Sequence, residues 1–215
     1  MTTVKACLFD LDGVIVDTAV YHFQAWRRLA NELGFDFTEH QNEQLKGISR
    51  MESLELILQW GGVSLSEAEK LDWATKKNQW YLDLVLQMTP NEVLPGVPAF
   101  LDALRANGIK IALGSASKNS KLILEKIQML DYFDAIIDGN NITKGKPDPQ
   151  VFLMGAEATH SLPSECVVFE DAVAGIQAAK AGGMKAIGVG SAEVLTEADF
   201  VISTFEEMTI ERLNF

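Results

Sequence analysis

Residues 4–13 read Val-Lys-Ala-Cys-Leu-Phe-Asp-Leu-Asp-Gly, a short apolar run that ends in two carboxylates and a glycine. The apolar part, Val4 to Phe9, predicts a strand buried on both faces of a sheet. Residues two apart in an extended segment point the same way, so Asp10 and Asp12 can face one site at the carboxyl end of the strand. The other interpretation of the acidic residues is a solvated turn.

Five more short apolar runs follow, separated by amphipathic segments. We expect strands over residues 109–113, 135–137, 166–169, 186–189 and 200–202. We expect helices over residues 97–107, 119–130, 149–160 and 172–182, and a weaker one over 192–198. Strands that alternate with helices predict an α/β fold, a Rossmann-like parallel sheet with helices on both faces.

The segment between the first two strands differs from the rest, because its apolar residues recur at helical spacing from about residue 17 to 88. Helices inserted between two strands of a sheet indicate a separate unit. We therefore expect an α/β core of residues 1–16 and 89–215 and an inserted helical cap of residues 17–88. The linkers between them should lie near residues 15–18 and 88–95.

Composition limits the classes of protein to consider. The chain has 215 residues, of which 47% are hydrophobic, so it can bury a core without disulfides. A net charge of −12 argues against a nucleic-acid or membrane partner. Cys7 and Cys166 lie in apolar runs and should be buried thiols. No apolar run approaches the roughly 20 residues of a membrane span, and the N-terminal residues lack a signal-peptide cleavage pattern. We therefore expect a cytoplasmic protein, and we expect it to be a monomer.

A second acidic pair, Glu170-Asp171, follows the expected strand over residues 166–169. Carboxylates from two strand ends repel one another unless a cation lies between them. Oxygen ligands of this kind suit Mg²⁺. Asp171 could also cap the helix that follows, and the two roles do not exclude each other.

Two further polar segments come after strands. Ser115 opens the run Ser-Ala-Ser-Lys-Asn, whose hydroxyl and backbone N–H groups could cradle a phosphate, although a plain serine cap would use the same residue. Lys146 precedes a proline-rich helix start and could neutralise a phosphate, although a single lysine is more often only solvated.

In chain order, these four segments resemble the four motifs of the haloacid dehalogenase superfamily of phosphotransferases, and the resemblance covers essentially the whole chain. It implies that Asp10 is a nucleophile that forms an aspartyl-phosphate and that Asp12 is the general acid and base. Ser115 and Lys146 would neutralise the phosphoryl oxygens, as such a transfer requires. The Mg²⁺ ligands it implies are Asp10, Asp12 through its backbone carbonyl, Glu170 and Asp171.

Residues 17–26 and 45–54 of the expected cap resemble the β-phosphoglucomutases of that superfamily, and so does the run 115–119. The resemblance implies that Arg50 grips the distal phosphate of a hexose bisphosphate. The other substrate-binding residues that it implies are His22, Trp26, Gly47, Ile48, Ser53, Lys77, Ala116, Ser117, Lys118 and Asn119. Met51 departs from the family pattern, in which a polar residue is expected.

Each of the cap residues has an ordinary alternative. Trp26 could fill a core, His22 could be a hydrogen-bonded histidine without a role, and Arg50 could be a solvated charge. Thr18 and His22 lie where the chain leaves the sheet, so we also expect a hinge there that couples cap closure to Asp12.

The function expected from this resemblance is a Mg²⁺-dependent mutase that interconverts β-D-glucose 1-phosphate and glucose 6-phosphate through an aspartyl-phosphate and a 1,6-bisphosphate. The alternative is a capped Mg²⁺-dependent sugar-phosphate phosphatase. The helical insert and Lys146 argue against a phospho-acceptor signalling domain. A dinucleotide-binding module is disfavoured because no G-x-G-x-x-G follows the first strand.

Overall fold

The structure is a computed structural model that describes residues 4–213, and its centre is a six-stranded parallel sheet. The strands are β1 (Ala6–Phe9), β2 (Lys110–Gly114), β3 (Ala135–Ile137), β4 (Cys166–Glu170), β5 (Lys185–Val189) and β6 (Phe200–Ile202). Their order is β3-β2-β1-β4-β5-β6, so the winding direction reverses between β1 and β4. This is the position where open α/β sheets bind ligands. The predicted fold class is confirmed.

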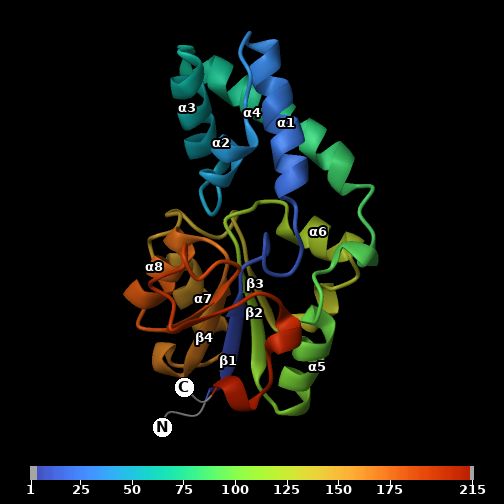
Figure 1. The fold of residues 1–215 in the computed structure, drawn as a ribbon, viewed down its shortest axis with the longest axis vertical. Coiled ribbons are helices and arrows are strands. Elements are labelled where there is room, and N and C mark those ends of the chain that lie inside the picture. Colours follow the sequence, from blue (N-terminus) through green and yellow to red (C-terminus); the bar gives the residue numbers. More distant parts are fainter. Residues whose placement is uncertain (1–3, 214–215) are drawn as a thin grey trace.

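Helices cover both faces of this sheet (Figure 1). The helices are α1 (Ala19–Glu32), α2 (Glu39–Glu43), α3 (Arg50–Gly61), α4 (Glu67–Val85), α5 (Val97–Ala106), α6 (Ser120–Lys126), α7 (Gln150–Ala158) and α8 (Val173–Ala181). Short 3-10 helices span Pro90–Glu92, Leu130–Tyr132, Pro163–Glu165, Phe205–Glu207 and Glu211–Leu213. Ala6 and Leu8 of β1 pack with α7 and α8, whereas Cys7 and Phe9 pack with α5 and α6. The alternation follows from the two-residue period of a strand.

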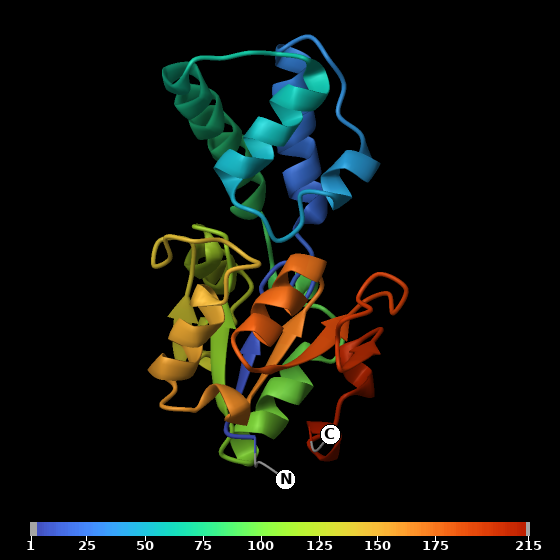
Figure 2. The same ribbon diagram turned by 90° about the vertical axis from the view of Figure 1, so that its left-hand side faces the viewer.

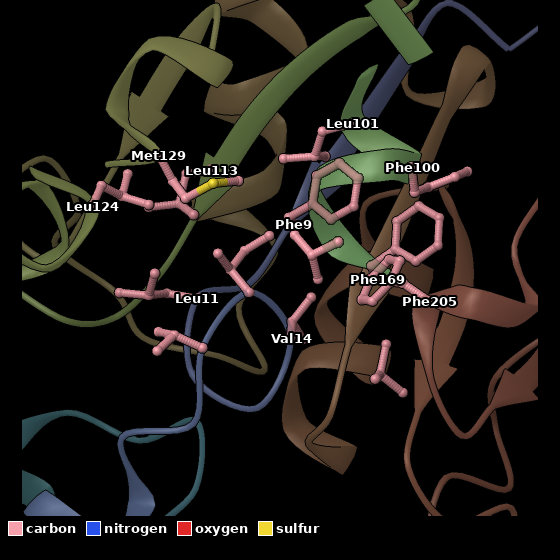
Figure 3. Packing of buried hydrophobic residues seen from close by; sticks show 14 of the residues in the cluster. Phe9, Leu11, Val14, Phe100, Leu101, Leu113, Leu124, Met129, Phe169 and Phe205 are labelled. Carbon is pink, nitrogen blue, oxygen red and sulfur yellow. The ribbon is translucent and has the colours of Figure 1, made fainter. Parts of the chain in front are cut away.

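Four phenylalanines pack together at the ends of β1 and β4 (Figure 3). The rings of Phe9 and Phe169 stack with centroids 4.7 Å apart and planes within 3°. Phe100 meets Phe169 edge-on at 5.4 Å, and Phe205 lies 5.3 Å from Phe169. Each buried ring contributes about 1.5–3 kcal/mol through burial. The next residues along the two strands, Asp10 and Glu170, therefore start from a rigid support.

Helices α1–α4 lie above the carboxyl ends of the strands and have an apolar cluster of their own (Figures 1 and 2). Its centre includes Trp26 and Leu29 of α1 and Leu54 and Ile57 of α3, all buried. The starts of α2, α3 and α4 each carry a capping box, such as Ser49 with Glu52. Such boxes satisfy the backbone N–H groups that a helix start leaves unpaired.

The chain leaves the sheet for these helices and returns at neighbouring points. Val16 forms an isolated antiparallel bridge with Val93, and the backbone N–H of Leu94 donates to the carbonyl of Ile15 at 2.9 Å. The two connecting segments therefore run side by side directly beyond Asp12.

The predicted strands are confirmed with shifts of one or two residues, but two predicted helices differ. The helix expected over residues 192–198 is wrong: Leu195 closes a single turn onto Ser191, and Asp199 then pairs with the backbone of Ala186 to begin β6. The helix expected over residues 119–130 ends at Lys126, because Gln128 adopts a φ of 59°.

Two other sequence predictions concern burial. Cys7 and Cys166 are buried and free of disulfides, as expected. Within residues 4–213, no helix combines the length and the apolar character that crossing a bilayer requires.

Candidate active site

Asp10, the predicted nucleophile, lies immediately beyond β1 and is nearly buried. Its backbone N–H donates to the carbonyl of Phe169 at 3.0 Å, which continues the pairing of β1 with β4 by one residue. Lys146 Nζ donates to Asp10 Oδ1 at 2.6 Å and to Glu170 Oε1 at 2.5 Å. Burial opposes the charge on Lys146, but the carboxylates of Asp10 and Glu170 outweigh it and raise the lysine pKa. The sequence prediction that Lys146 supplies positive charge here agrees with this position.

Asp12 faces the same cavity as Asp10, two residues further along. Thr18 Oγ1 donates a hydrogen bond to Asp12 Oδ1. Burial, followed by the neighbouring Asp10 carboxylate, raises the pKa of Asp12 to about 7, even though the Thr18 hydrogen bond acts in the opposite direction. A carboxyl group with such a pKa can hold or release a proton near neutral pH. The contact also joins Asp12 to the start of α1, where the sequence predicts a hinge.

Three carboxylates converge beyond the ends of β1 and β4, and a ligand oxygen from each of Asp10, Glu170 and Asp171 lies within 4.8 Å of the others. Burial raises the pKa values of Glu170 and Asp171, and the Asp10 carboxylate raises both further, although Lys146 acts against the rise at Glu170. Lys146 carries one positive charge and pairs with both Asp10 and Glu170, whereas the only cation paired with Asp171 among the described residues is Lys46, at 3.4 Å. The three carboxylates therefore carry more negative charge than the neighbouring lysines offset. Oxygen ligands in such an arrangement fit a hard divalent cation.

Two glycines allow this crowding. At Gly13, φ is +77° and a Cβ would lie 2.2 Å from Asp171 Oδ2. At Gly175, a Cβ would lie 1.9 Å from the carboxyl carbon of Glu170. A larger residue at either position would displace a candidate metal ligand.

The alternative roles considered for the acidic and serine segments are wrong in detail. Asp171 does not cap α8, which begins after Ala172 without a side-chain cap. Glu170 instead accepts from the Ala172 N–H at 2.8 Å. Ser115 is not the cap of α6 either: its Oγ accepts from the Ser117 N–H at 3.1 Å. The hydroxyl therefore organises the loop that follows β2.

A cavity of about 500 Å³ lies between the carboxyl ends of the strands and helices α1, α3 and α4. Asp10, Asp12 and Asp171 line it from the core, while Lys146 and Glu170 lie buried behind them. All the predicted substrate-binding residues also line it, namely His22, Trp26, Gly47, Ile48, Arg50, Ser53, Lys77, Ala116, Ser117, Lys118 and Asn119. The structure thus brings the predicted site residues of both parts of the chain to one place.

Buried Lys77 of α4 and half-buried His22 of α1 form a pair at the side of the cavity. Lys77 Nζ lies 2.9 Å from His22 Nδ1 and 4.2 Å from the centroid of the Trp26 ring. Burial lowers the pKa of both groups, and the positive charge of Arg50 lowers both further. Trp26 is therefore both a core residue and a wall of the cavity.

Arg50 and Lys118 are the cations best placed to receive an anion. Arg50 begins α3 and is partly buried, and burial lowers the pKa of its guanidinium. Neither Arg50 nor Lys118 makes an ion pair with a carboxylate in the part of the chain that the structure describes. Because a partly buried guanidinium is costly without a partner, this arrangement favours an anionic ligand in the cavity.

Two polar contacts that sequence reasoning missed join α1–α4 to the core. Lys46 contacts Asp171, and Asn119 Nδ2 donates to Asn78 Oδ1 at 3.0 Å. The sequence held only an indirect signal for these two contacts. Lys46 precedes Gly47 and Asn78 follows Lys77, and the family resemblance implies a substrate-binding role for Gly47 and Lys77.

Comparisons with known proteins agree with this geometry. The family model for haloacid dehalogenase-like hydrolases matches residues 4–183. The β-phosphoglucomutase of Bacillus subtilis is 44% identical over 212 residues, which cover 98% of this chain and 94% of that protein. The crystal structure of β-phosphoglucomutase from Clostridium difficile superposes with a TM-score of 0.95 at 43% identity, covering 99% of this chain and 96% of that one.

A phosphatase is also related, at a lower level. A phosphorylated carbohydrates phosphatase of Thermotoga maritima is 32% identical over 187 residues, which cover 85% of this chain and 83% of that protein. From the family model, the identities and the arrangement of the four motif segments, the chain belongs to the haloacid dehalogenase-like hydrolase family, among its β-phosphoglucomutases.

Proposed function

We propose that the chain catalyses the β-phosphoglucomutase reaction, the interconversion of β-D-glucose 1-phosphate and glucose 6-phosphate through an aspartyl-phosphate and a 1,6-bisphosphate. The observation that carries this proposal is that Asp10, Asp12 and Asp171 line the same cavity as Arg50 and Lys118. A mutase must hold a sugar with two phosphates, one beside the nucleophile and one away from it. The similarity to two β-phosphoglucomutases supports this choice of substrate.

The reacting groups follow from their positions. A carboxylate oxygen of Asp10 attacks phosphorus, the sugar oxygen leaves and takes a proton from Asp12, and Asp10 holds the phosphoryl group as an acyl phosphate. In the return transfer, Asp12 takes the proton of the attacking sugar hydroxyl, and Asp10 is released as a carboxylate. Lys146 is close enough to Asp10 to offset charge on the phosphoryl oxygens.

The carboxylates of Asp10, Glu170 and Asp171, with the backbone carbonyl of Asp12, would hold Mg²⁺. The ion would neutralise charge on the transferring group when bound. Glu170 is fixed for this role by Lys146 and by the Ala172 N–H. Ser115, with the backbone of the loop that it organises, would bind the same phosphate from the β2 side.

We infer that residues 17–88 act as a cap on a core of residues 1–16 and 89–215. The separate apolar cluster of α1–α4 supports this division. Arg50, helped by Lys118 and Asn119, would hold the distal phosphate, and Gly47, Ile48, Ser53, Ala116 and Ser117 would contact the substrate. His22, Lys77 and Trp26 would complete the wall around the sugar. A closed cap would exclude water from the acyl phosphate.

We also propose that the enzyme works as a cytoplasmic monomer on small sugar phosphates. Two buried free thiols suit a reducing compartment. The net charge of −12 disfavours a nucleic acid as partner.

The experiment is incubation with β-glucose 1-phosphate, Mg²⁺ and a trace of glucose 1,6-bisphosphate, with glucose 6-phosphate and inorganic phosphate measured together. A mutase forms glucose 6-phosphate without a matching release of phosphate. Release of phosphate in step with loss of substrate would instead identify a sugar-phosphate phosphatase.

A further inference from the structure

A second cavity, of about 810 Å³, adjoins the candidate active site on the other side of Asp171. It lies between the start of α8, the segments that follow β5 and β6, and the loop from α2 to α3. In Figure 2 this loop descends towards the upper end of α8, drawn in orange. Neither the proposed mechanism nor any predicted site residue requires this second space.

The two cavities share a wall. Gly13, Asp17, Lys46, Ile48 and Asp171 line both of them. Asp10 and Asp12 line only the first cavity. A small ligand can therefore reach the candidate metal ligand Asp171 from either side, whereas a sugar phosphate that meets the nucleophile must occupy the first cavity.

The remaining charged lining residues differ between the cavities. In the first, apart from the shared wall and the reacting carboxylates, they are Arg50, Glu52, Lys77, Lys118 and Lys144. In the second, the corresponding set within residues 4–213 is Glu43 alone. Asp10 and Asp12 also line the first cavity, so outside the shared wall the described residues give it three carboxylates and four cations, whereas the second holds Glu43 alone. The second cavity is therefore the more favourable approach for a cation, and the four cations make the first the better approach for an anion.

Lys46 stands between the two cavities. Its Nζ lies 2.9 Å from Glu43 Oε2, on the side of the second cavity, and 3.4 Å from Asp171 Oδ2. The side chain is 36% exposed, so it has room to move from Asp171 towards Glu43. Such a movement would expose Asp171 to the second cavity and keep the lysine charge paired.

We propose that the second cavity is the route by which a hydrated divalent cation reaches and leaves Asp171, with Lys46 as its gate. This proposal rests on the metal site of the proposed function and adds to it a path by which the ion enters and leaves. It allows the ion to exchange while a sugar phosphate fills the first cavity. Sugar and metal then enter by separate openings whose charges suit each ligand.

The first test changes the charge at the mouth of the second cavity. Val194 lines it with a side chain that is 58% exposed, so Val194→Lys and Val194→Glu alter charge without removing a packed group. Leu162, which is 63% exposed and lines neither cavity, takes the same substitutions as the matched control. Stopped-flow mixing of the metal-free enzyme with Mn²⁺ gives the association rate.

We expect Val194→Glu to bind Mn²⁺ roughly fivefold to tenfold faster than Val194→Lys at about 10 mM ionic strength, with the difference shrinking as salt screens it. The two Leu162 variants should have equal rates. Lys46→Gln should accelerate association further, since it removes the positive charge at the gate. Equal rates for the two Val194 variants, or an equal difference at Leu162, would overturn the route.

The second test closes the first cavity. Release of Mn²⁺ into excess EDTA is followed by the electron paramagnetic resonance signal of manganese, with and without saturating glucose 6-phosphate. We expect release to continue at a similar rate in the presence of the sugar phosphate. Release that glucose 6-phosphate abolishes would place the metal and the sugar on one path. Failure of Mn²⁺ to bind the wild-type enzyme at all would instead remove the metal site of the proposed function, and the route with it.

Discussion

Replacing Arg50 with alanine tests whether the cap holds a phosphate away from the nucleophile. The guanidinium lines the cavity, is partly buried and has no carboxylate partner among the described residues. The substitution therefore removes a cation without leaving a protein carboxylate unpaired. The remaining residues at the Asp10 cluster are untouched, because Lys146 and Glu170 make their contacts within the core.

The size of the effect follows from the hydrogen bonds that the guanidinium can donate. A hydrogen bond to a charged group contributes about 1.5–3 kcal/mol. Two such bonds to a distal phosphate would contribute about 3–6 kcal/mol, which corresponds to a loss of roughly 10²–10⁴ in kcat/KM for the sugar substrate. Acetyl phosphate has no distal phosphate, so phosphorylation of Asp10 by this donor should change by less than about twofold.

The assay compares the two donors in the same preparations. Mutase turnover is measured with β-glucose 1-phosphate, and formation of the phosphoenzyme is measured with acetyl phosphate. Arg27→Ala is the control, because Arg27 lies on α1 but is 49% exposed and pairs with Asp36 at 2.9 Å. Equal losses with both donors in Arg50→Ala would refute the assignment and place Arg50 at the core site or in a structural role.

Three further changes test other parts of the site. Asp10→Asn keeps the shape but removes the attacking charge, so activity should fall by several orders of magnitude and labelled bisphosphate should leave no acid-stable label on the enzyme; a trapped phosphoryl group would contradict the assignment. Asp171→Ala should raise the Mg²⁺ concentration for half-maximal activity by at least about tenfold while circular dichroism stays unchanged; an unaltered Mg²⁺ dependence would exclude Asp171 as a ligand. Burial, then the charges of Lys77 and Arg50, lowers the pKa of His22. The unfolded chain therefore binds a proton below about pH 6.5 that the folded chain does not, and stability should fall as pH decreases, by up to about 1.4 kcal/mol per pH unit. Urea unfolding from pH 5 to 7.5 should show a shallower slope for His22→Gln but not for the exposed His160→Gln, and equal slopes would show that folded His22 takes up the proton.

The core half of the site could be predicted from the sequence because parallel strands end at the same edge of a sheet. Asp10 follows β1 and Glu170 ends β4. The pairing of β1 with β4 continues by one residue to Asp10, so both carboxylates accept hydrogen bonds from Lys146. The prediction that Lys146 reaches this site depended on the family resemblance. Lys146 lies in the loop before α7, where no helical or strand periodicity predicts the direction of a side chain.

The contacts between the segment that contains α1–α4 and the rest of the chain could not be predicted in the same way. Lys46–Asp171 and Asn78–Asn119 depend on how helices α1–α4 are oriented over the sheet, and no local pattern encodes that orientation. Apolar spacing was also misleading over residues 192–198. There the chain must turn back within a few residues to place Asp199 beside Ala186, and tertiary hydrogen bonds override the helical pattern.

The two segments that connect helices α1–α4 to the sheet are paired at Ile15–Val16 and Val93–Leu94. This pairing explains how a segment of several helices can be inserted between two strands of a sheet. The two ends of the insert are hydrogen-bonded neighbours, so the junction itself holds the two connecting segments together whatever lies between them. The entropy of closing a loop grows slowly with length, by about 0.6 kcal/mol for each doubling. Helical units of very different size can therefore be exchanged at this one junction while β1 and β2 keep their register. Such an exchange must still supply apolar side chains in place of Tyr81, Val85 and Met88, which pack into the core cluster beside the junction.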